Sequence, residues 1–296
     1  MELLSQLHQI LAPAGLDLLR LCVWLAALLA LFATLEKRWA LHPQKLFRKA
    51  FGTDLVYYFL SGFTPKLLLL LPLGVVASAV HHVLPVDYYY WIEDLPILGR
   101  AAAALVVSEI GSYWGHRWSH EIPFLWRFHA IHHSAEEIDW LVNTRAHPID
   151  MLFIRLTGLL PMYALGLAQP ASSSIDLVPM AVTIIGTMWG FFIHANVGWR
   201  FRWLELLLST PAFHHWHHTN DGPEQINKNY SAMLPWIDKC FGTFYLPQQW
   251  PRKYGIDAPP VADGLAGQML GPLTWRKGID APAGDQPDES VLHPKM

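Results

Sequence analysis

The sequence has little charge. Only 15% of its 296 residues are charged and 52% are hydrophobic, whereas a soluble chain usually carries about a quarter charged residues. The deficit is concentrated in five stretches: Leu18–Leu35, Leu55–Leu84, Ala101–Gly115, Met151–Ala168 and Leu177–Ala195. A membrane-spanning helix needs roughly 20 apolar residues, and several of these stretches reach or approach that length. We therefore expect a multi-span, all-α integral membrane protein rather than a soluble protein with a large helical core.

Several classes of site are also missing. The two cysteines, Cys22 and Cys240, lie far apart and have no metal-ligand spacing, so we expect neither a structural disulfide nor a cysteine metal site. The net charge of -3 argues against a nucleic-acid partner. No flavin, haem-attachment or nucleotide motif is present, and neither is the HExxH pattern of zinc hydrolases. A redox reaction would therefore need electrons from another protein.

The distribution of basic residues predicts which side of the membrane each loop occupies. Residues 36–50 contain five lysines and arginines, whereas residues 85–99 contain three acidic residues and no lysine or arginine. Lysine and arginine near span ends mark the cytoplasmic side. We therefore expect residues 116–150 and those after 196 to be cytoplasmic. Residues 151–195 should form a helical hairpin that turns near Pro170 and Ser172–Ser174.

Histidine, in contrast, is abundant and patterned. Of 16 histidines, 11 fall between His116 and His218. Three boxes contain spacings of three and four residues: HRWSH (116–120), HAIHH (129–133) and HHWHH (214–218). Residues three and four apart share one face of a helix, so each box can aim two or three imidazoles at one point. This favours metal coordination over ordinary hydrogen-bonded histidines, without naming the metal among Fe, Zn, Cu and Ni.

The residues around the boxes support their placement on helices. Thr210 and Pro211 predict a helix start, with Thr210 as N-cap and Pro211 at the first position. We predict that residues 101–120 form one continuous helix, which runs from the membrane into the cytosol. Glu109 shares its histidine face, where it would either hold a ligand histidine from a second layer or satisfy a neighbouring helix. His215 should point away from its neighbours.

Four motifs follow one another between residues 116 and 218: HRWSH, FHAIHH, FIHAN and FHHWHH. A further stretch at residues 229–245 closes the region. In this order they resemble the membrane fatty acid hydroxylase/sterol desaturase superfamily. The resemblance implies that residues 101–250 form a catalytic domain of fatty acid hydroxylase type, with a cytosolic helical cap over a di-iron centre. Residues 1–100 then hold the N-terminal spans, and residues 251–296, rich in Pro, Gly, Asp and Ala, form a loosely ordered tail.

The resemblance also implies a set of iron ligands. Some members carry a second histidine four residues after the one that matches His194, but Gly198 stands there in this chain. His147 is the candidate to supply that missing ligand. The full set is His116, His120, His129, His132, His133, His147, His194, His214, His217 and His218.

The activity implied by the family is oxidation of a lipid C–H bond with O2. The substrate would be a membrane lipid of sterol, fatty acyl or alkylglycerol type, and the product an alcohol or an alkene. Electrons would come from an external donor, a ferredoxin or a cytochrome with its reductase. Two other functions stay open: a zinc-dependent membrane hydrolase, and a non-enzymatic metal- or haem-binding membrane protein.

Overall fold

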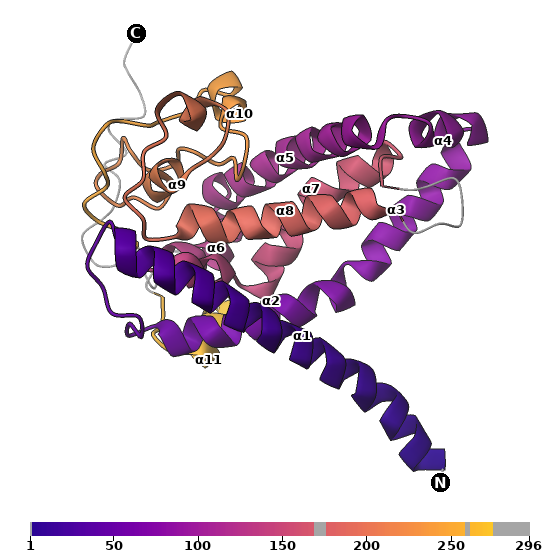
Figure 1. The fold of residues 1–296 in the computed structure, drawn as a ribbon, viewed down its shortest axis with the longest axis horizontal. Coiled ribbons are helices and arrows are strands. Elements are labelled where there is room, and N and C mark those ends of the chain that lie inside the picture. Colours follow the sequence, from indigo (N-terminus) through magenta and orange to yellow (C-terminus); the bar gives the residue numbers. More distant parts are fainter. Residues whose placement is uncertain (1, 169–175, 258–260, 275–296) are drawn as a thin grey trace.

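The computed structural model describes residues 2–168, 176–257 and 261–274, which fold into helices joined by loops (Figure 1). Within these residues, β-pairing is limited to two isolated bridges. The helices are α1 (Glu2–Trp39), α2 (Phe51–Leu68), α3 (Leu70–Val83), α4 (Val86–Glu93), α5 (Ile97–Glu121), α6 (Pro123–His133), η1 (Trp140–Thr144), α7 (Pro148–Ala164), α8 (Leu177–His194), η2 (Arg202–Leu206), α9 (Pro211–His217), α10 (Trp236–Cys240) and α11 (Leu265–Thr274). The prediction of an all-α fold is confirmed.

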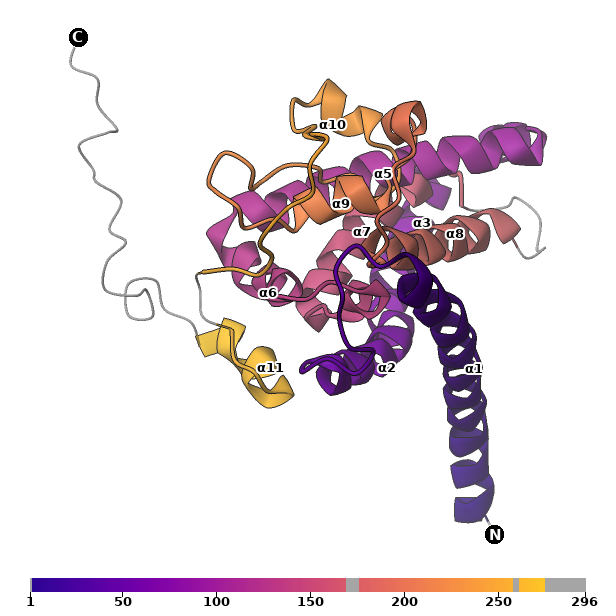
Figure 2. The ribbon, with the colours of Figure 1, turned by 60° about the vertical axis from the view of Figure 1, so that its left-hand side comes forward.

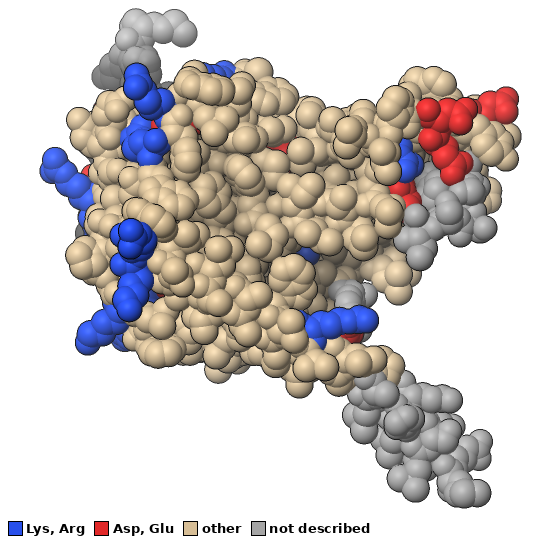
Figure 3. All heavy atoms as spheres, in the orientation of Figure 1, with Lys and Arg blue, Asp and Glu red and all other residues tan. Residues whose placement is uncertain are grey.

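Three helical segments are long and apolar enough to cross a membrane: Pro13–Trp39, Phe51–Val83 and Leu177–His194. The pair α4 and α5, bent by 110° at its break, would count as a fourth. α7 has 17 residues and is shorter than these segments. Figure 3 shows most of the lysine and arginine of the visible face at one end and most of its acidic residues at the other end, over α4, with a surface between them that is largely but not wholly free of charge. These apolar segments and the separation of charge indicate an integral membrane protein.

α5 is the helix around which the histidine-bearing elements assemble, since it packs against α6, α7 and α8. Its contact with α7 is close because both helices present glycine. A Cβ on Gly111 would overlap the carbonyl oxygen of Thr157, and a Cβ on Gly115 would overlap the Thr157 hydroxyl. A Cβ on Gly158 would overlap the hydroxyl of Ser112. Small residues allow helix backbones to approach in a membrane, where packing holds helices together.

Replacing Gly111 by alanine should lower the free energy of unfolding by about 1–3 kcal/mol, the usual cost of inserting a methyl group into a packed contact. The neighbouring atom is a backbone oxygen, which cannot rotate away. Thermal unfolding in detergent would measure the loss. Gly99→Ala on the same helix is the matched control, because no atom lies within 4 Å of its added Cβ. Equal stability of the two variants would contradict this account of the α5–α7 contact.

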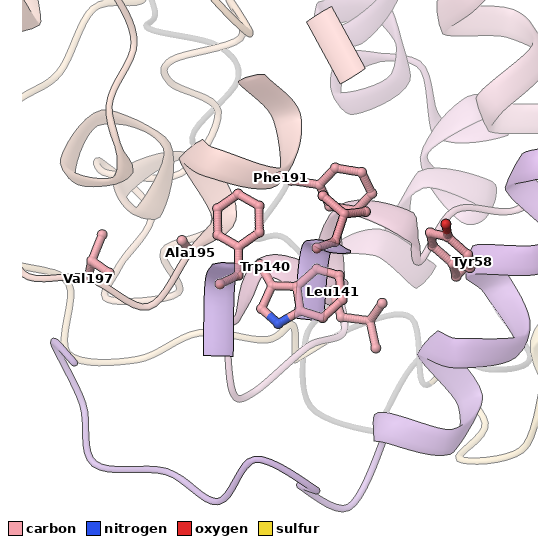
Figure 4. Close-up of a cluster of buried hydrophobic side chains, with 8 residues drawn as sticks. Tyr58, Trp140, Leu141, Phe191, Ala195 and Val197 are labelled. Carbon is pink, nitrogen blue, oxygen red and sulfur yellow. The ribbon is translucent and has the colours of Figure 1, made fainter. Parts of the chain in front are cut away.

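Buried apolar side chains tie α1 and α2 to the end of α8 (Figure 4). Phe32 of α1 stacks on Trp140 of η1, with ring centroids 5.9 Å apart, and both rings pack against Phe191 of α8. Tyr58 of α2 belongs to the same cluster. Since Phe191 lies one turn before His194, the cluster fixes the position of that histidine from outside the histidine boxes.

Four buried charged side chains link the start of α2 to the segment between α6 and α7. Asp54 accepts hydrogen bonds from Arg48 (2.6 Å) and Arg145 (2.6 Å), and Asp139 accepts two more from Arg48. None of these side chains is more than 5% exposed. Two positive and two negative charges balance, which is the condition under which burying such groups is tolerated. We call these four residues the ion cluster.

Two expectations concern the connections and the tail. The turn of the predicted hairpin, near Pro170 and Ser172–Ser174, lies outside the described residues. Within the segment expected to be loosely ordered, residues 265–274 instead form α11, which lies against α6 (Figure 2). Its attachment is polar as well as apolar, since His147 bonds the carbonyl oxygen of Met269. Composition alone did not indicate this docking.

Candidate metal centre

The histidines converge into two groups at one end of the helical bundle, where α6, α9 and the C-terminal ends of α5 and α8 meet (Figure 1). In each group, one nitrogen of every ring lies within 4.8 Å of the others. Cluster A consists of His116, His120, His129, His133 and His217. Cluster B consists of His132, His194, His214 and His218.

Helical spacing explains how a few helices supply all nine histidines of the two clusters. His116 and His120 lie one turn apart on α5, and His129 and His133 do the same on α6. α9 begins as predicted, with the Thr210 hydroxyl accepting a hydrogen bond from the Phe213 amide and Pro211 at the first position. His194 is the last residue of α8. Each box is therefore set by local helix geometry, whereas their meeting depends on how the helices pack.

Carbonyl oxygens orient the rings. The Nδ1 atoms of His116, His132, His194 and His217 lie 2.7–3.1 Å from the backbone oxygens of Tyr230, Arg145, Gly190 and Lys228, respectively. A carbonyl oxygen only accepts, so in each pair Nδ1 carries the hydrogen and donates it. The other nitrogen, Nε2, then presents a lone pair to the cluster. This is the arrangement by which proteins fix metal-binding histidines.

The spacing of the nitrogens in cluster B fits a single metal ion. The Nε2 atom of His194 lies 2.9 Å from that of His214, 3.2 Å from that of His218 and 3.3 Å from that of His132. Metal–nitrogen bonds of about 2.0–2.1 Å in a tetrahedron separate the ligand nitrogens by about 3.3 Å. The Nε2 atoms of His132 and His194 both present lone pairs, because their Nδ1 atoms donate to carbonyl oxygens, and two lone pairs facing each other at 3.3 Å would repel without a cation between them.

Cluster A contains ring nitrogens that have no hydrogen-bond partner in the described ranges of the chain. The Nε2 atoms of His120, His133 and His217 are buried and have no hydrogen-bond partner among the described residues. The remaining two rings approach each other, with the Nε2 atoms of His116 and His129 3.1 Å apart. Buried polar nitrogens normally have partners, and a cation bound at their centre would supply the one that these three nitrogens lack.

The two clusters touch each other. His132 and His133 are adjacent on α6 yet belong to different clusters, and the same is true of His217 and His218. The rings of His133 and His218 stack across the boundary with centroids 4.4 Å apart. Two metals held in this way would be near neighbours, as in dinuclear catalytic sites.

Burial keeps these rings neutral. Loss of hydration, and then repulsion from neighbouring imidazoles, holds the pKa far below its ordinary value in the rings outside the membrane-spanning helices. These rings are His132, His133, His214, His217 and His218. A neutral imidazole is the form that binds a metal, so the environment prepares the rings for coordination at neutral pH.

Asp150 is a site residue that the sequence analysis missed. Its Oδ2 accepts a hydrogen bond from Nδ1 of His129 (2.9 Å), and its Oδ1 accepts one from the Ser119 hydroxyl (3.3 Å). The carboxylate is buried in the first turn of α7. A carboxylate behind a ligand histidine fixes its tautomer and raises its basicity. Only its position, three residues after His147 at a helix start, could have drawn attention to it.

Asp150→Asn should weaken metal binding by about 10–100-fold, the usual effect of losing such a partner. Chelator competition against the purified protein would measure the change in affinity. Ser119→Ala is the control, because it removes the other hydrogen bond of Asp150 and leaves His129 paired. An asparagine variant with unchanged metal affinity would remove Asp150 from the site.

Three other residues singled out from the sequence lie outside the clusters. His147 caps α7: its Nδ1 accepts from the Ile149 amide and its Nε2 bonds the Met269 oxygen, so both nitrogens are occupied. Glu109 accepts hydrogen bonds from the amides of Met233 and Leu234 rather than from a histidine. His215 faces away as expected, and bonds Tyr254 and the Ala195 oxygen.

A cavity of about 570 Å³ connects the clusters to the interior of the helical bundle. Its walls come from α1, α2, α5, α7 and α8, and His116, His129, His132, His194 and His214 line one end of it. Two of its lining residues, Trp24 of α1 and Ile184 of α8, are about half exposed on the apolar surface of the bundle. The volume is within the range of sites that hold small molecules or part of a lipid.

Residues 101–243 match the family described as fatty acid hydroxylase. The chain is 36% identical over 221 residues to the ornithine lipid hydroxylase of Rhizobium tropici, covering 73% of this chain and 63% of that protein. It is 32% identical to the alkylglycerol monooxygenases of Danio rerio and Homo sapiens, in each case over 53% of this chain. The chain thus spans less than two thirds of the first relative and about a third of the other two. No solved structure matches the chain.

Proposed function

We propose that the protein is an O2-dependent oxidoreductase that hydroxylates a C–H bond of a membrane lipid at two irons, as the match of residues 101–243 to the fatty acid hydroxylase family supports. The observation that carries the proposal is the pair of adjacent histidine clusters at the end of a cavity. The irons would be held by the nine histidines of clusters A and B. Hydroxylation is preferred to desaturation because the relatives compared here are named as a hydroxylase and as monooxygenases.

The bound irons would supply the activation of O2: with two electrons from the external donor and two protons, one oxygen atom would enter the C–H bond as hydroxyl and the other would leave as water. The chain's own contribution is to hold and orient. Backbone oxygens fix four ligand rings, and Asp150 fixes a fifth, His129. The helix packing that places these rings also buries them, which keeps bulk water away from the reacting carbon.

The cavity supports a lipid as the substrate. Its walls are mostly apolar side chains, and three of the helices that provide them, α1, α2 and α8, belong to segments long and apolar enough to cross a bilayer. Trp24 of α1 and Ile184 of α8 both line the cavity and are about half exposed, which supports sideways entry of a lipid between these two helices. A zinc hydrolase would need an attacking water near a general base, and the carboxylates that line the cavity, Glu109 and Asp150, are already bound to backbone amides and to His129.

Two further parts of the proposal rest on the sequence. The basic residues at the end of α1, Lys37 and Arg38, support a cytoplasmic position for the histidine end. The absence of a flavin, haem-attachment or nucleotide motif supports an external electron donor, of ferredoxin or cytochrome type with its reductase.

Metal content and Mössbauer spectroscopy of protein grown with iron-57 test the proposal. We expect about two irons per chain in a coupled pair, as in dinuclear sites. The same preparation, given O2 and a chemical or protein reductant, should add one oxygen atom to a lipid from a bacterial lipid extract, detected by mass spectrometry. Stoichiometric zinc that persists after iron-rich growth, with no oxygenated product, would favour the hydrolase instead.

A further inference from the structure

One cationic side chain of the cavity has no role in the centre described above. The face of α7 that lines the cavity contains Met151, Ile154, Arg155, Gly158 and Leu159, which recur at helical spacing. Arg155 is therefore directed into the cavity wall rather than toward the outer surface. Among the described residues that line the cavity, it is the one lysine or arginine.

Arg155 has no partner within the described part of the chain. No hydrogen bond or ion pair joins its guanidinium to any residue there, although the side chain is only partly exposed. The two acidic residues of the cavity are engaged elsewhere, Glu109 with backbone amides and Asp150 with His129 and Ser119. The other buried arginines of the protein, such as Arg48 and Arg145, are paired with aspartates.

An unpaired charge in a site shielded from water is costly, and charged residues at membrane depth usually mark a pathway or a binding site. The cost is removed when a ligand supplies the opposite charge. A guanidinium offers a planar fork of N–H donors that fits a carboxylate or a phosphate with two parallel hydrogen bonds. The missing partner of Arg155 is therefore an oxyanion that enters the cavity with the ligand.

We propose that Arg155 binds the anionic group, a carboxylate or a phosphate, of the lipid that occupies this cavity. The inference rests on the proposed function in treating that lipid as the substrate. It selects anionic lipids as the substrate class, in preference to sterols and neutral glycerol ethers. The hydroxyls of Ser112 and Thr187 line the same cavity and provide polar surface for the rest of a headgroup.

The position of Arg155 also orients the ligand. Asp150, which holds His129, precedes Arg155 by five residues on α7, a rise of about 7.5 Å along the helix axis. An oxyanion held at Arg155 would therefore lie in the same cavity as the histidines that line it, about one and a half helical turns along α7 from the residue that supports His129. The anionic group would then be held inside the cavity, near the part of the lipid that meets the clusters.

Equilibrium binding of matched lipids to the purified protein, without reductant, tests the proposal. One pair is an N-acylglycine and its methyl ester; the other is a lysophosphatidate and the monoacylglycerol with the same chain. In at least one pair the anionic member should bind about tenfold tighter or more, the usual effect of charge-assisted hydrogen bonds out of water. The pair that shows the preference identifies carboxylate or phosphate as the group.

In Arg155→Met the preference should disappear while the neutral members bind as before. Arg38→Met is the matched control, because Arg38 is exposed at the end of α1 and does not line the cavity. That variant should keep the preference. Equal binding of both members of each pair to the unaltered protein would overturn the proposal, and so would a preference that survives in Arg155→Met. Equal binding to the unaltered protein would overturn the proposal even if the methionine variant does not fold.

The readout separates this inference from the proposed function. Lipid binding without reductant requires no turnover, so a protein that proves to hold zinc would still show the preference if Arg155 binds an oxyanion. Conversely, a protein with two irons that hydroxylates a neutral lipid, and binds acid and ester equally, would keep the proposed function and lose the assignment of Arg155.

Discussion

Replacing His132 by alanine should remove the metal of cluster B and abolish hydroxylation. His132 is buried, its Nδ1 donates to the Arg145 oxygen, and its Nε2 faces that of His194 at 3.3 Å. Alanine removes one of the four nitrogens of cluster B, so the three that remain should bind a metal much more weakly. Metal analysis should fall from about two ions per chain to about one, because the ligands of cluster A are intact.

His147→Asn is the control for this experiment. Asparagine is a good N-cap, so it keeps the side-chain acceptor at the start of α7 while it removes the imidazole. We expect unchanged metal content and activity in detergent, because His147 lies outside both clusters. Loss of a metal in His147→Asn, or full activity in His132→Ala, would show that the ligands are assigned incorrectly.

Asp54→Ala should lower the free energy of unfolding by about 3–5 kcal/mol, the typical cost of leaving buried charges without a partner. Asp54 is fully buried and is the acceptor shared by Arg48 and Arg145. Without it, two guanidinium groups would have one carboxylate, Asp139, between them. Thermal and denaturant unfolding in detergent would measure the loss.

Asp263→Asn provides the comparison with an exposed ion pair. Asp263 pairs with Lys49 at 3.2 Å, and both side chains are more than 80% exposed. Exposed pairs contribute little, so stability should stay within about 0.5 kcal/mol of the unaltered protein. If both variants were equally stable, the ion cluster would not be what holds α2 to the segment between α6 and α7.

Local pattern was sufficient for several features because their causes are local. Thr210 and Pro211 predict the start of α9, since capping involves residues within one turn. The continuous helix predicted for residues 101–120 is α5. Three of the five apolar runs, those at residues 18–35, 55–84 and 177–195, coincide with segments long and apolar enough to cross a membrane, because the length of a run and its lack of charge are properties of the chain itself. The direction of His215, away from its neighbours, follows from the 100° step between helical residues.

Glu109 shows where local pattern stopped being sufficient. Its position on the histidine face of α5 left two roles open, and the choice was made by Met233 and Leu234, more than a hundred residues away. α11 is a similar case, since its place against α6 depends on contacts such as that of Met269 with His147. Composition shows that a segment has few apolar residues, but it does not show which residues of other helices they contact.

The sequence by itself therefore determined the kind of protein: an all-helical membrane chain with histidines at metal-ligand spacing, in an order that resembles the fatty acid hydroxylase family. The tertiary structure decided which histidines meet. It divided His132 from His133 and His217 from His218, left His147 outside, placed Asp150 behind His129, and left Arg155 alone in the cavity. Spacing along a helix fixes which side chains share a face. The rotation and depth at which α5 to α9 pack fix what each face meets, and that depends on long-range contacts.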